Sequence, residues 1–394
     1  MAFVRTLAWF GVTILSAVLC FGQTITVGST TEQLTNAQRI AVGGSGTSSL
    51  TYYWPDGNIG ALSHSGTNII FAPTLNDSGQ SGTVQTTLSN LNNWTSGLSL
   101  ALPATNIAIG GSGAFDQNYA GGNAMYYDTA SGYLIQLYHG EFWYNGSDES
   151  EPFYSSHGLA YSTDFGNTWH KLGQVVSPQT TRTSDCQAEV GAGTLLVVGS
   201  YLYDYYTDTS TGCSSPYLAV ARATISSVIA AAEAGTPFTS GPGTLFMKYT
   251  GSGTWNGDGV TNLASPASGG GASVQITASS DGGILLEPNV RYNSYLNKYL
   301  LVYANGLNTS NSIEAQWSTD GVTWTDTQVL ISGADLAYYP SLLNTSGGDP
   351  QTLGQNFSVF YVSPLEYPGE NLYSTALSVV SRPPPPVLAQ PVVN

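Results

Sequence analysis

Residues 161–169 read Tyr161-Ser162-Thr163-Asp164-Phe165-Gly166-Asn167-Thr168-Trp169, a pattern with the chemistry of a tight β-turn. Asp164 can accept hydrogen bonds from backbone N–H groups of its own turn, as Asp does in Asx-turns. Gly166 permits a positive φ that other residues avoid, and Trp169 brings a large apolar surface to the start of the next strand. The stretch therefore predicts a hairpin turn with a structural rather than a catalytic role.

Related patterns recur along the sequence and indicate a repeated unit. The clearest copy occupies residues 317–324 and reads Trp-Ser-Thr-Asp-Gly-Val-Thr-Trp, while two weaker copies end at Trp94 and Trp255. Each of the four tryptophans should mark an outer-strand turn in a different repeat: Trp94, Trp169, Trp255 and Trp324.

Strand patterns of period two, separated by Gly, Asn and Asp turns, run through residues 25–380. This arrangement predicts an all-β protein. Five weakly similar units can be aligned at the length of a propeller blade, and each has an opening polar or acidic residue followed by two strands. The sequence therefore predicts a five-bladed β-propeller over residues 24–381. A six-bladed propeller is the alternative.

Three segments depart from this simple repeat. Residues 224–234 form the one short helical pattern, which Gly235 ends. Residues 240–280 are dense in Gly, Ser and Ala and predict an insertion or an extended connection in blade three. Residues 24–28 are expected to supply a strand that closes the ring, and residues 382–394 form a Pro-rich tail or linker.

The N-terminus has the features of an export signal. Arg5 precedes an apolar run over residues 7–20, and small residues follow, so residues 1–22 are expected to be a signal peptide. The protein should accordingly be secreted or periplasmic. In such an oxidising compartment, Cys186 and Cys213 are expected to form a disulfide.

The charge balance limits the partners. The chain has 9 Lys and Arg against 25 Asp and Glu, a formal net charge of −16. Nucleic acid and anionic membranes are therefore poor partners, and no other apolar run is long enough to span a bilayer. A monomer that meets neutral carbohydrate, with no cofactor, is expected. The acidic loop 148–151 offers ligands for a structural Ca²⁺, although its spacing is not that of a recognised calcium loop.

Acidic residues stand at equivalent positions of the predicted units. Because the inner strands of a propeller surround one axis, residues at their starts should converge on one face of the channel. Crowded carboxylates raise one another's pKa, and glycoside hydrolysis needs one protonated and one ionised carboxyl. Structural roles remain open for two of the residues: a turn cap for Asp56 and a Glu-Pro corner for Glu287. The residues that open the five units are Asp56, Asp116, Glu189, Glu287 and either Tyr338 or Tyr339.

Further polar residues are candidates for binding sugar hydroxyls at the mouth of this site. Glu141 follows His139 near an aromatic pair, and His157 precedes the turn at 161–169. The expected substrate-binding residues are Glu141, His157, Glu287, Arg291 and Tyr339.

Two resemblances give these residues roles. The turn at 161–169 resembles the Asp-box of sialidase-like β-propellers. The order of Asp56, Asp116 and Glu189 on three successive blades resembles the five-bladed arabinanase/xylosidase and invertase/levansucrase glycosidases. That resemblance implies that Asp56 is the base or nucleophile, Asp116 tunes and positions, and Glu189 is the acid.

Two alternatives stand beside the secreted glycoside hydrolase. The first is a non-catalytic propeller that binds glycans or a surface partner. The second is a true exo-sialidase, which needs three arginines and a Tyr–Glu pair. Arg291 and Tyr339 fit parts of that pattern, but Ala41 stands after Arg39-Ile40 where Pro is expected.

Overall fold

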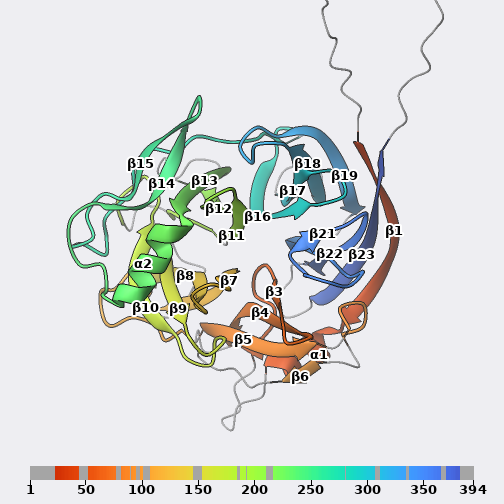
Figure 1. Cartoon of the computed structure of the whole chain (residues 1–394), viewed down its shortest axis with the longest axis horizontal. Helices are drawn as coiled ribbons and strands as arrows, with labels where there is room; N and C mark the ends of the chain where they lie inside the picture. Colours follow the sequence, from red (N-terminus) through yellow and green to blue (C-terminus); the bar gives the residue numbers. More distant parts are fainter. Residues whose placement is uncertain are drawn as a thin grey trace, which may run out of the picture.

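The computed structural model describes residues 23–43, 52–76, 81–88, 90–94, 98–100, 107–144, 153–183, 187–191, 193–209, 216–279, 281–306, 311–333, 337–364 and 370–381. These residues form five mainly antiparallel sheets. Figure 1 shows the sheets arranged as blades around a common axis. The prediction of a five-bladed all-β propeller is confirmed.

The strands follow one another from blade to blade in sequence order, except for β1, which joins the last blade, and the short β21, which pairs in blade four. Blade one contains β2 (Tyr52–Tyr53), β3 (Gly60–His64), β4 (Thr67–Asn76), β5 (Ser81–Leu88) and β6 (Leu98–Leu100). Blade two contains β7 (Tyr119–Tyr127), β8 (Leu134–Trp143), β9 (Phe153–Ser162) and β10 (His170–Val176). Blade three contains β11 (Thr194–Val198), β12 (Tyr201–Asp208), β13 (Tyr217–Thr224), β14 (Gly243–Gly251) and β15 (Thr254–Val260). Blade four contains β16 (Ile284–Asn293), β17 (Lys298–Gly306), β18 (Asn311–Ser318), β19 (Thr325–Gly333) and the short β21 (Thr352–Leu353). Blade five contains β20 (Tyr338–Leu343), β22 (Asn356–Ser363), β23 (Asn371–Ser381) and β1 (Gln23–Leu34).

The ring is closed by the N-terminal strand. Strand β1 pairs antiparallel with β23, in a register that places Gln23 opposite Ser381 and Leu34 opposite Leu372. The Thr30 and Thr375 hydroxyls share a hydrogen bond of 2.8 Å across this pair. The first strand of the propeller is therefore the outermost strand of the last blade, as the segment 24–28 predicted. This pairing covers an edge of β23 that would otherwise be open.

The turn at 161–169 connects the third and fourth strands of blade two. Asp164 accepts hydrogen bonds from Thr168 N at 2.8 Å and Thr168 Oγ1 at 2.7 Å, and Ser162 Oγ donates to it at 2.7 Å. Gly166 has a φ of 85°. Burial raises the pKa of Asp164, but the donors on Thr168 and Ser162 outweigh it and leave the pKa below its usual value. The ionised carboxylate thus holds the turn together.

The shorter copy has the same construction between β18 and β19. Asp320 accepts from Thr323 N at 2.8 Å and Val322 N at 2.9 Å. Trp94 lies between β5 and β6 of blade one, and Trp255 lies in β15 of blade three. The four tryptophans therefore fall in four different blades.

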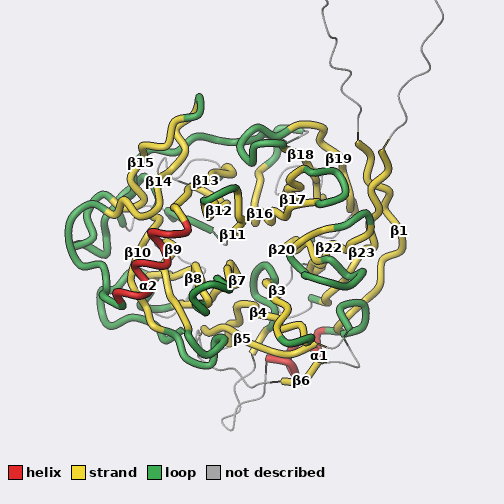
Figure 2. The backbone as a smooth tube through the Cα atoms, in the orientation of Figure 1, coloured by secondary structure: helices red, strands yellow, loops and turns green. Residues whose placement is uncertain are grey.

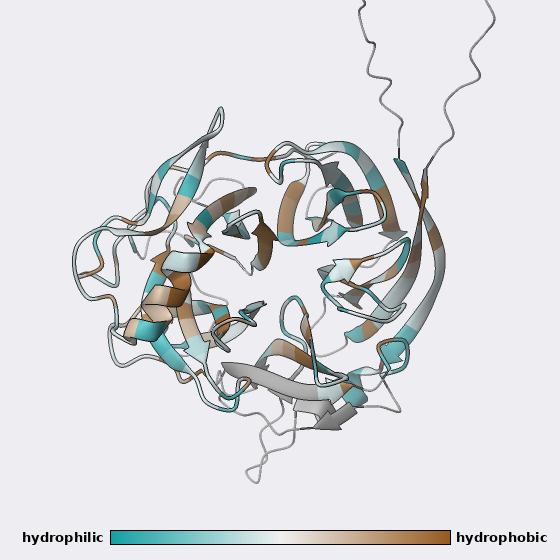
Figure 3. Ribbon diagram, viewed as in Figure 1, coloured by the Kyte–Doolittle hydropathy of each residue, from teal (hydrophilic) through white to brown (hydrophobic). Residues whose placement is uncertain are grey.

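One apolar cluster lies between each neighbouring pair of blades in the described residues. Alternating side chains on each sheet face supply these clusters, and Figure 3 shows apolar residues concentrated along the strands. The pairs of buried residues that represent the five interfaces, from blades one and two round to blades five and one, are Phe71 with Met125, Leu137 with Leu195, Tyr205 with Leu301, Val302 with Phe357, and Phe360 with Ile70.

Two helices accompany the sheets, where the sequence predicted one. Helix α2 (Ile225–Ala234) is the predicted helix: Thr224 caps its start, and Gly235 ends it with a φ of 60°. Helix α1 (Asn36–Gly43) was not predicted. Its signal was a capping box, because Thr35 N donates to Gln38 Oε1 at 2.9 Å and Gln38 N donates back to Thr35 Oγ1 at 3.3 Å. Figure 2 shows both helices at the periphery of the ring.

The Gly-rich segment 240–280 is, of the two predicted alternatives, mainly an insertion in blade three. Its first half forms the hairpin β14–β15, which adds two strands to the outside of blade three. The remainder, up to residue 279, is irregular and packs against blade two through backbone bonds such as Arg182 N to Ala267 O at 3.0 Å.

Several predictions fall on residues outside the described ranges. These are the signal peptide 1–22, the tail 382–394, the pairing of Cys186 with Cys213, and the acidic loop 148–151. Over the part of the chain that is described, no helix has the length and apolar character needed to cross a membrane.

The Asp164 turn provides a test of how far one side chain stabilises a blade. Asp164→Ala removes the acceptor for three donors, so we expect a loss of about 1–2 kcal/mol in the free energy of unfolding. Urea denaturation measures this loss. Glu233→Ala, which removes an exposed carboxylate on helix α2, is the matched control and should change stability by less than about 0.5 kcal/mol. Equal effects of the two substitutions would contradict the structural role of the turn.

Candidate active site

Three carboxylates from three blades lie together at one end of the channel. Asp56 precedes β3, Glu189 precedes β11, and Glu287 lies in β16. The charges of Asp56 and Glu189 both act on Glu287. The structure therefore brings three of the four predicted unit-opening acids into one cluster.

Two tyrosines from neighbouring blades hold Asp56. Tyr119 Oη of β7 donates to Asp56 Oδ2 at 3.2 Å, and Tyr339 Oη of β20 donates to Oδ1 at 3.5 Å. The Asp56 backbone N also donates to Pro73 O on β4 at 2.9 Å. Hydroxyl donors stabilise a carboxylate in its ionised form. The Asp56 carboxyl group is therefore held with both of its oxygens oriented.

Both glutamates are positioned by one strand end. Glu287 N donates to Thr207 Oγ1 at 3.0 Å, and Glu189 N donates to Thr209 Oγ1 at 2.5 Å. Thr207 and Thr209 are two residues apart at the end of β12, so their side chains lie on the same face. Segment 188–190 is further fixed by bridges that pair Ala188 with Tyr154 of blade two and Val190 with Asp208 of blade three.

The backbone at the mouth has the same unusual conformation in two blades. Glu287 and Tyr339 both have a φ of 54°. Each precedes a proline, and each lies at a register shift of its inner strand, in β16 and in β20. A positive φ is uncommon outside glycine, and such strain gathers at functional sites. The repeated conformation supports the alignment of these two positions across the units.

Asparagine side chains tie the inner strands to one another below the acids. Asn58 Nδ2 donates to Pro340 O of blade five at 2.7 Å. Asn289 of blade four donates to Thr194 Oγ1 of blade three at 3.2 Å and accepts from Leu342 N of blade five at 3.0 Å. These bonds fix the relative positions of four inner strands along the channel axis, and therefore the positions of the carboxylates.

Burial and like charge alter the proton affinity of the two glutamates. Burial, followed by the charge of Glu189, raises the pKa of Glu287 to about 8. Glu287 is only 7% exposed, and its Oε2 has no hydrogen-bond partner among the described residues. Burial also raises the pKa of Glu189, against the opposing charge of His139. Near neutral pH Glu287 therefore keeps its proton.

A histidine cation stands beside the acids. His139 contacts Glu141 Oε1 through Nε2 at 2.9 Å and Val190 O through Nδ1 at 3.0 Å, so both ring nitrogens face acceptors. Burial disfavours the imidazolium, but Glu141 outweighs it, with smaller contributions from Glu189 and Glu287, and the pKa of His139 rises to about 9. Trp143 Nε1 donates to Glu141 Oε2 at 2.5 Å and completes the network.

Asp116 is the predicted site residue that the structure does not place with the others. Its carboxylate is paired with Lys171 on the outer strand β10 and accepts from Tyr138 Oη at 3.0 Å. Strand β7 begins at Tyr119, so Asp116 lies in the preceding turn, where Gly110 N donates to Asp116 O at 2.8 Å. Tyr119 extends to the cluster instead. The interpretation of Asp116 as the tuning carboxylate of the site therefore needs correction.

Two predicted binding residues lie elsewhere. His157 is 1% exposed, and its ring nitrogens contact Asp204 Oδ2 at 2.8 Å and Gly191 O at 3.0 Å, so neither is left for a sugar hydroxyl. Arg291 follows Glu287 along β16 and lines a pocket away from the acids. Glu141 and Tyr339 do lie at the cluster, through His139 and Asp56.

Tyr119, Thr207 and Thr209 were not identified from the sequence. Tyr119 lies three residues beyond Asp116, and a strand pattern extended back from residue 123 would have reached it. No local sequence pattern identifies the two threonines, because their hydrogen-bond partners are distant in the sequence. Thr209 accepts from Glu189, which is 20 residues away, and Thr207 accepts from Glu287, which is 80 residues away.

Comparison with known proteins identifies the fold. No protein-family model matches the sequence, and neither does any curated protein. Among solved structures, the protein BT0996 in an RGII complex has a TM-score of 0.51 at 14% identity, with 92% of the present protein and 93% of BT0996 covered. A structure named "Glycoside hydrolase" has a TM-score of 0.50 at 13% identity, with 95% and 94% covered. These likenesses show a shared propeller fold.

Glu287 provides a test through the pH dependence of stability. Between about pH 4.5 and 8 the folded protein keeps a proton that the unfolded chain releases, so this group makes stability fall as pH rises. Glu287→Gln should therefore stabilise the protein at pH 8, by on the order of a few kcal/mol, relative to its effect at pH 4.5. Urea unfolding at both pH values measures the difference. An identical effect at the two pH values, or the same pattern in the exposed control Glu233→Gln, would refute the assignment.

Asp116 provides a second test. Asp116→Asn leaves Lys171 without its carboxylate, so we expect a loss of about 1–2 kcal/mol in stability, because Lys171 keeps some contact with water. Any hydrolytic activity should stay within about threefold of the wild type, since Asp116 does not touch the cluster. Urea unfolding and steady-state kinetics on the same preparations check both statements. A large fall in kcat with unchanged stability would return Asp116 to the active site.

Proposed function

We propose that this protein is a secreted or periplasmic glycoside hydrolase that acts on a poly- or oligosaccharide. The observation that carries the proposal is the convergence of Asp56, Glu189 and Glu287 from three blades, with the pKa of Glu287 raised to about 8. Pairs of carboxyls whose environments separate their pKa values provide the acid and the base of glycoside hydrolysis. The acidic surface and abundant aromatic side chains suit a neutral sugar ligand.

Asp56 is the base or nucleophile. Tyr119 and Tyr339 each donate a hydrogen bond to one of its oxygens and so direct both of them. An ionised carboxylate in this position acts on the anomeric carbon, directly or through water, while the transition state develops positive charge on the sugar ring.

Glu189 is the general acid. Burial raises its pKa, which favours the protonated form that must deliver a proton to the leaving oxygen. Glu189 is also more accessible than Glu287, which is largely enclosed. Glu287 takes the place that the resemblance implied for Asp116: it is the neighbouring carboxyl whose proton keeps the local negative charge low.

The His139–Glu141 pair completes the balance of charge. The imidazolium attracts Glu189 electrostatically, while His139 Nδ1 holds Val190 O, the carbonyl next to Glu189 in the sequence. The pair therefore orients the acid without itself touching the reacting atoms.

The sialidase alternative lacks its arginines among the described residues. Arg39 is paired with Glu370 at 2.7 Å, and Arg222 packs over Trp255 on the outside of blade three. Arg182 packs over Phe142 and donates to Gly113 O at 3.3 Å, and Arg291 lies away from the carboxylates. No three of them meet around a substrate carboxylate. The propeller named as a glycoside hydrolase shares the fold of this protein, which is compatible with a carbohydrate substrate.

The roles are tested with substrates that differ in their leaving group. Glu189→Gln should lower kcat/KM for unactivated oligosaccharides by about 10²–10⁴-fold, because no proton reaches the leaving oxygen. Aryl glycosides with acidic phenols need no such proton and should lose much less. Initial rates on both substrate types, after a polysaccharide screen has identified the sugar, measure this dependence.

The matched variants are Asp56→Asn and Glu287→Gln. Asp56→Asn should lower the rates of both substrate types equally, and Glu287→Gln should shift the pH profile without selectivity for the leaving group. If the dependence on the leaving group appeared in Glu287→Gln and not in Glu189→Gln, the assignment of Glu189 as the general acid would be wrong. Saturable glycan binding with no hydrolysis by the wild type would instead make the protein a non-catalytic binder.

A further inference from the structure

We propose that the opposite end of the channel holds a second ligand site, which binds a small organic monocarboxylate with an apolar body through Arg291. The site is independent of the proposed hydrolase activity. It is a pocket of about 410 Å³ formed by blades two, three, four and five. Pockets of this size hold small molecules.

The pocket and the acid cluster lie at opposite ends of the same inner strands. Tyr119 of β7 reaches Asp56, whereas Met125 and Tyr126 of β7 line the pocket. Seven residues of strand separate Tyr119 from Tyr126, which is about 20 Å. On β16, likewise, Glu287 belongs to the cluster and Arg291 to the pocket.

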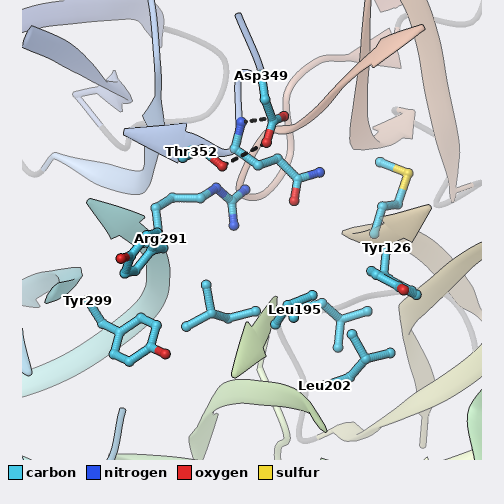
Figure 4. Close-up of a pocket in the computed structure, with 12 residues that line it drawn as sticks. Tyr126, Leu195, Leu202, Arg291, Tyr299, Asp349 and Thr352 are labelled. Atoms are coloured by element: carbon cyan, nitrogen blue, oxygen red, sulfur yellow. Dashed lines mark hydrogen bonds between the residues drawn. The ribbon is translucent and has the colours of Figure 1, made fainter. Parts of the chain in front are cut away.

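Arg291 is a buried cation whose donors are largely unused. It is 4% exposed, its Nη1 donates to Val290 O at 3.0 Å, and its Nε has no hydrogen-bond partner among the described residues. Figure 4 shows its side chain extending from β16 into the pocket. A guanidinium presents its donors in a planar fork that matches the two oxygens of a carboxylate. Burial lowers the pKa of Arg291 to about 10, so a bound anion would offset an electrostatic penalty.

Asp349, the acid whose charge acts on Arg291, already accepts hydrogen bonds within its own loop. Asp349 Oδ1 accepts from Gln351 N at 3.1 Å, and Oδ2 accepts from Thr352 Oγ1 at 2.8 Å, as the dashed lines in Figure 4 show. Asp349 acts on Arg291 through its charge and is exposed. It therefore limits the net positive charge of the pocket, which favours a singly charged ligand over a dianion.

The remaining walls select the body of the ligand. Leu195, Leu196 and Leu202 of blade three line the pocket together with Met125. Tyr299 lies on the same side of the pocket as Arg291. Leucine and methionine surfaces gain from covering an apolar group and offer no hydrogen bonds to sugar hydroxyls. The lining also contains polar side chains, but their donors are engaged elsewhere: Tyr126 Oη donates to Asp128 Oδ1 at 2.9 Å, Tyr292 Oη to Asn297 Oδ1 at 2.9 Å, and Gln351 Nε2 to Ala61 O at 2.8 Å. An aliphatic or aromatic monocarboxylate fits this combination of a free cation and a largely apolar wall.

Benzoate is a suitable probe, with benzamide as its neutral isostere. Calorimetric titration at constant ionic strength, which removes differences in screening, should show saturable binding of benzoate and none of benzamide. Arg291→Met should weaken benzoate binding by at least about tenfold, the loss expected for a charge-assisted pair. Arg222→Met, which alters a guanidinium stacked on Tyr201 and Trp255 of blade three, is the matched control and should bind as the wild type does.

Two further measurements keep the proposal falsifiable. Asp349→Asn should bind benzoate at least as tightly as the wild type, because it removes an opposing charge. If Arg291→Met fails to fold, benzoate should still shift the Nε–Hε resonance of one buried arginine in the wild type. Absence of saturable benzoate binding, equal binding of benzamide, or wild-type affinity in a folded Arg291→Met protein would overturn the proposal.

Discussion

The pairing of β1 with β23 is the constraint on which the rest of the structure depends. A propeller places each functional residue by the angular position of its blade, and the five apolar interfaces between blades define those angles only when the ring is complete. The strand pair joins the two ends of the described chain, with Gln23 opposite Ser381. Because these contacts are separated by more than 300 residues, closing the ring carries a loop-closure entropy that the apolar interfaces must offset.

Closure brings acids together in a protein that has few cations to neutralise them. The acids at the mouth are held by neutral partners. Tyrosine hydroxyls donate to Asp56, and threonine oxygens accept from the backbone N–H groups of Glu189 and Glu287. These contacts orient the acids while leaving their mutual repulsion in place. Burial and, after it, this repulsion keep a proton on Glu287, and His139 supplies the one cation of the described cluster. Orientation and proton affinity are thus set by different groups.

The channel is electrostatically asymmetric. Strand β16 carries Glu287 toward one end and the buried Arg291 toward the other, and β7 likewise contributes Tyr119 to one end and Tyr126 to the other. Short inner strands therefore present two different chemical environments, because residues only a few positions apart lie at opposite openings. A ligand that suits one end is poorly suited to the other.

The sequence alone determined the features that depend on neighbouring residues. The turns at Asp164 and Asp320, the helix between Thr224 and Gly235, and the period-two strands are local patterns, and all were predicted within a few residues. The repeat also placed Asp56, Glu189 and Glu287 at equivalent blade positions.

Only the tertiary structure decided which side chains face the axis. Asp116 turns to Lys171 because it lies in the turn that precedes β7, whose first residue, Tyr119, reaches the cluster in its place. His157 is kept from the acids by its contact with Asp204 of blade three. Arg291 lies farther along β16 than Glu287 and lines a different pocket. Such contacts join residues distant in the sequence, and composition and periodicity carry no information about them.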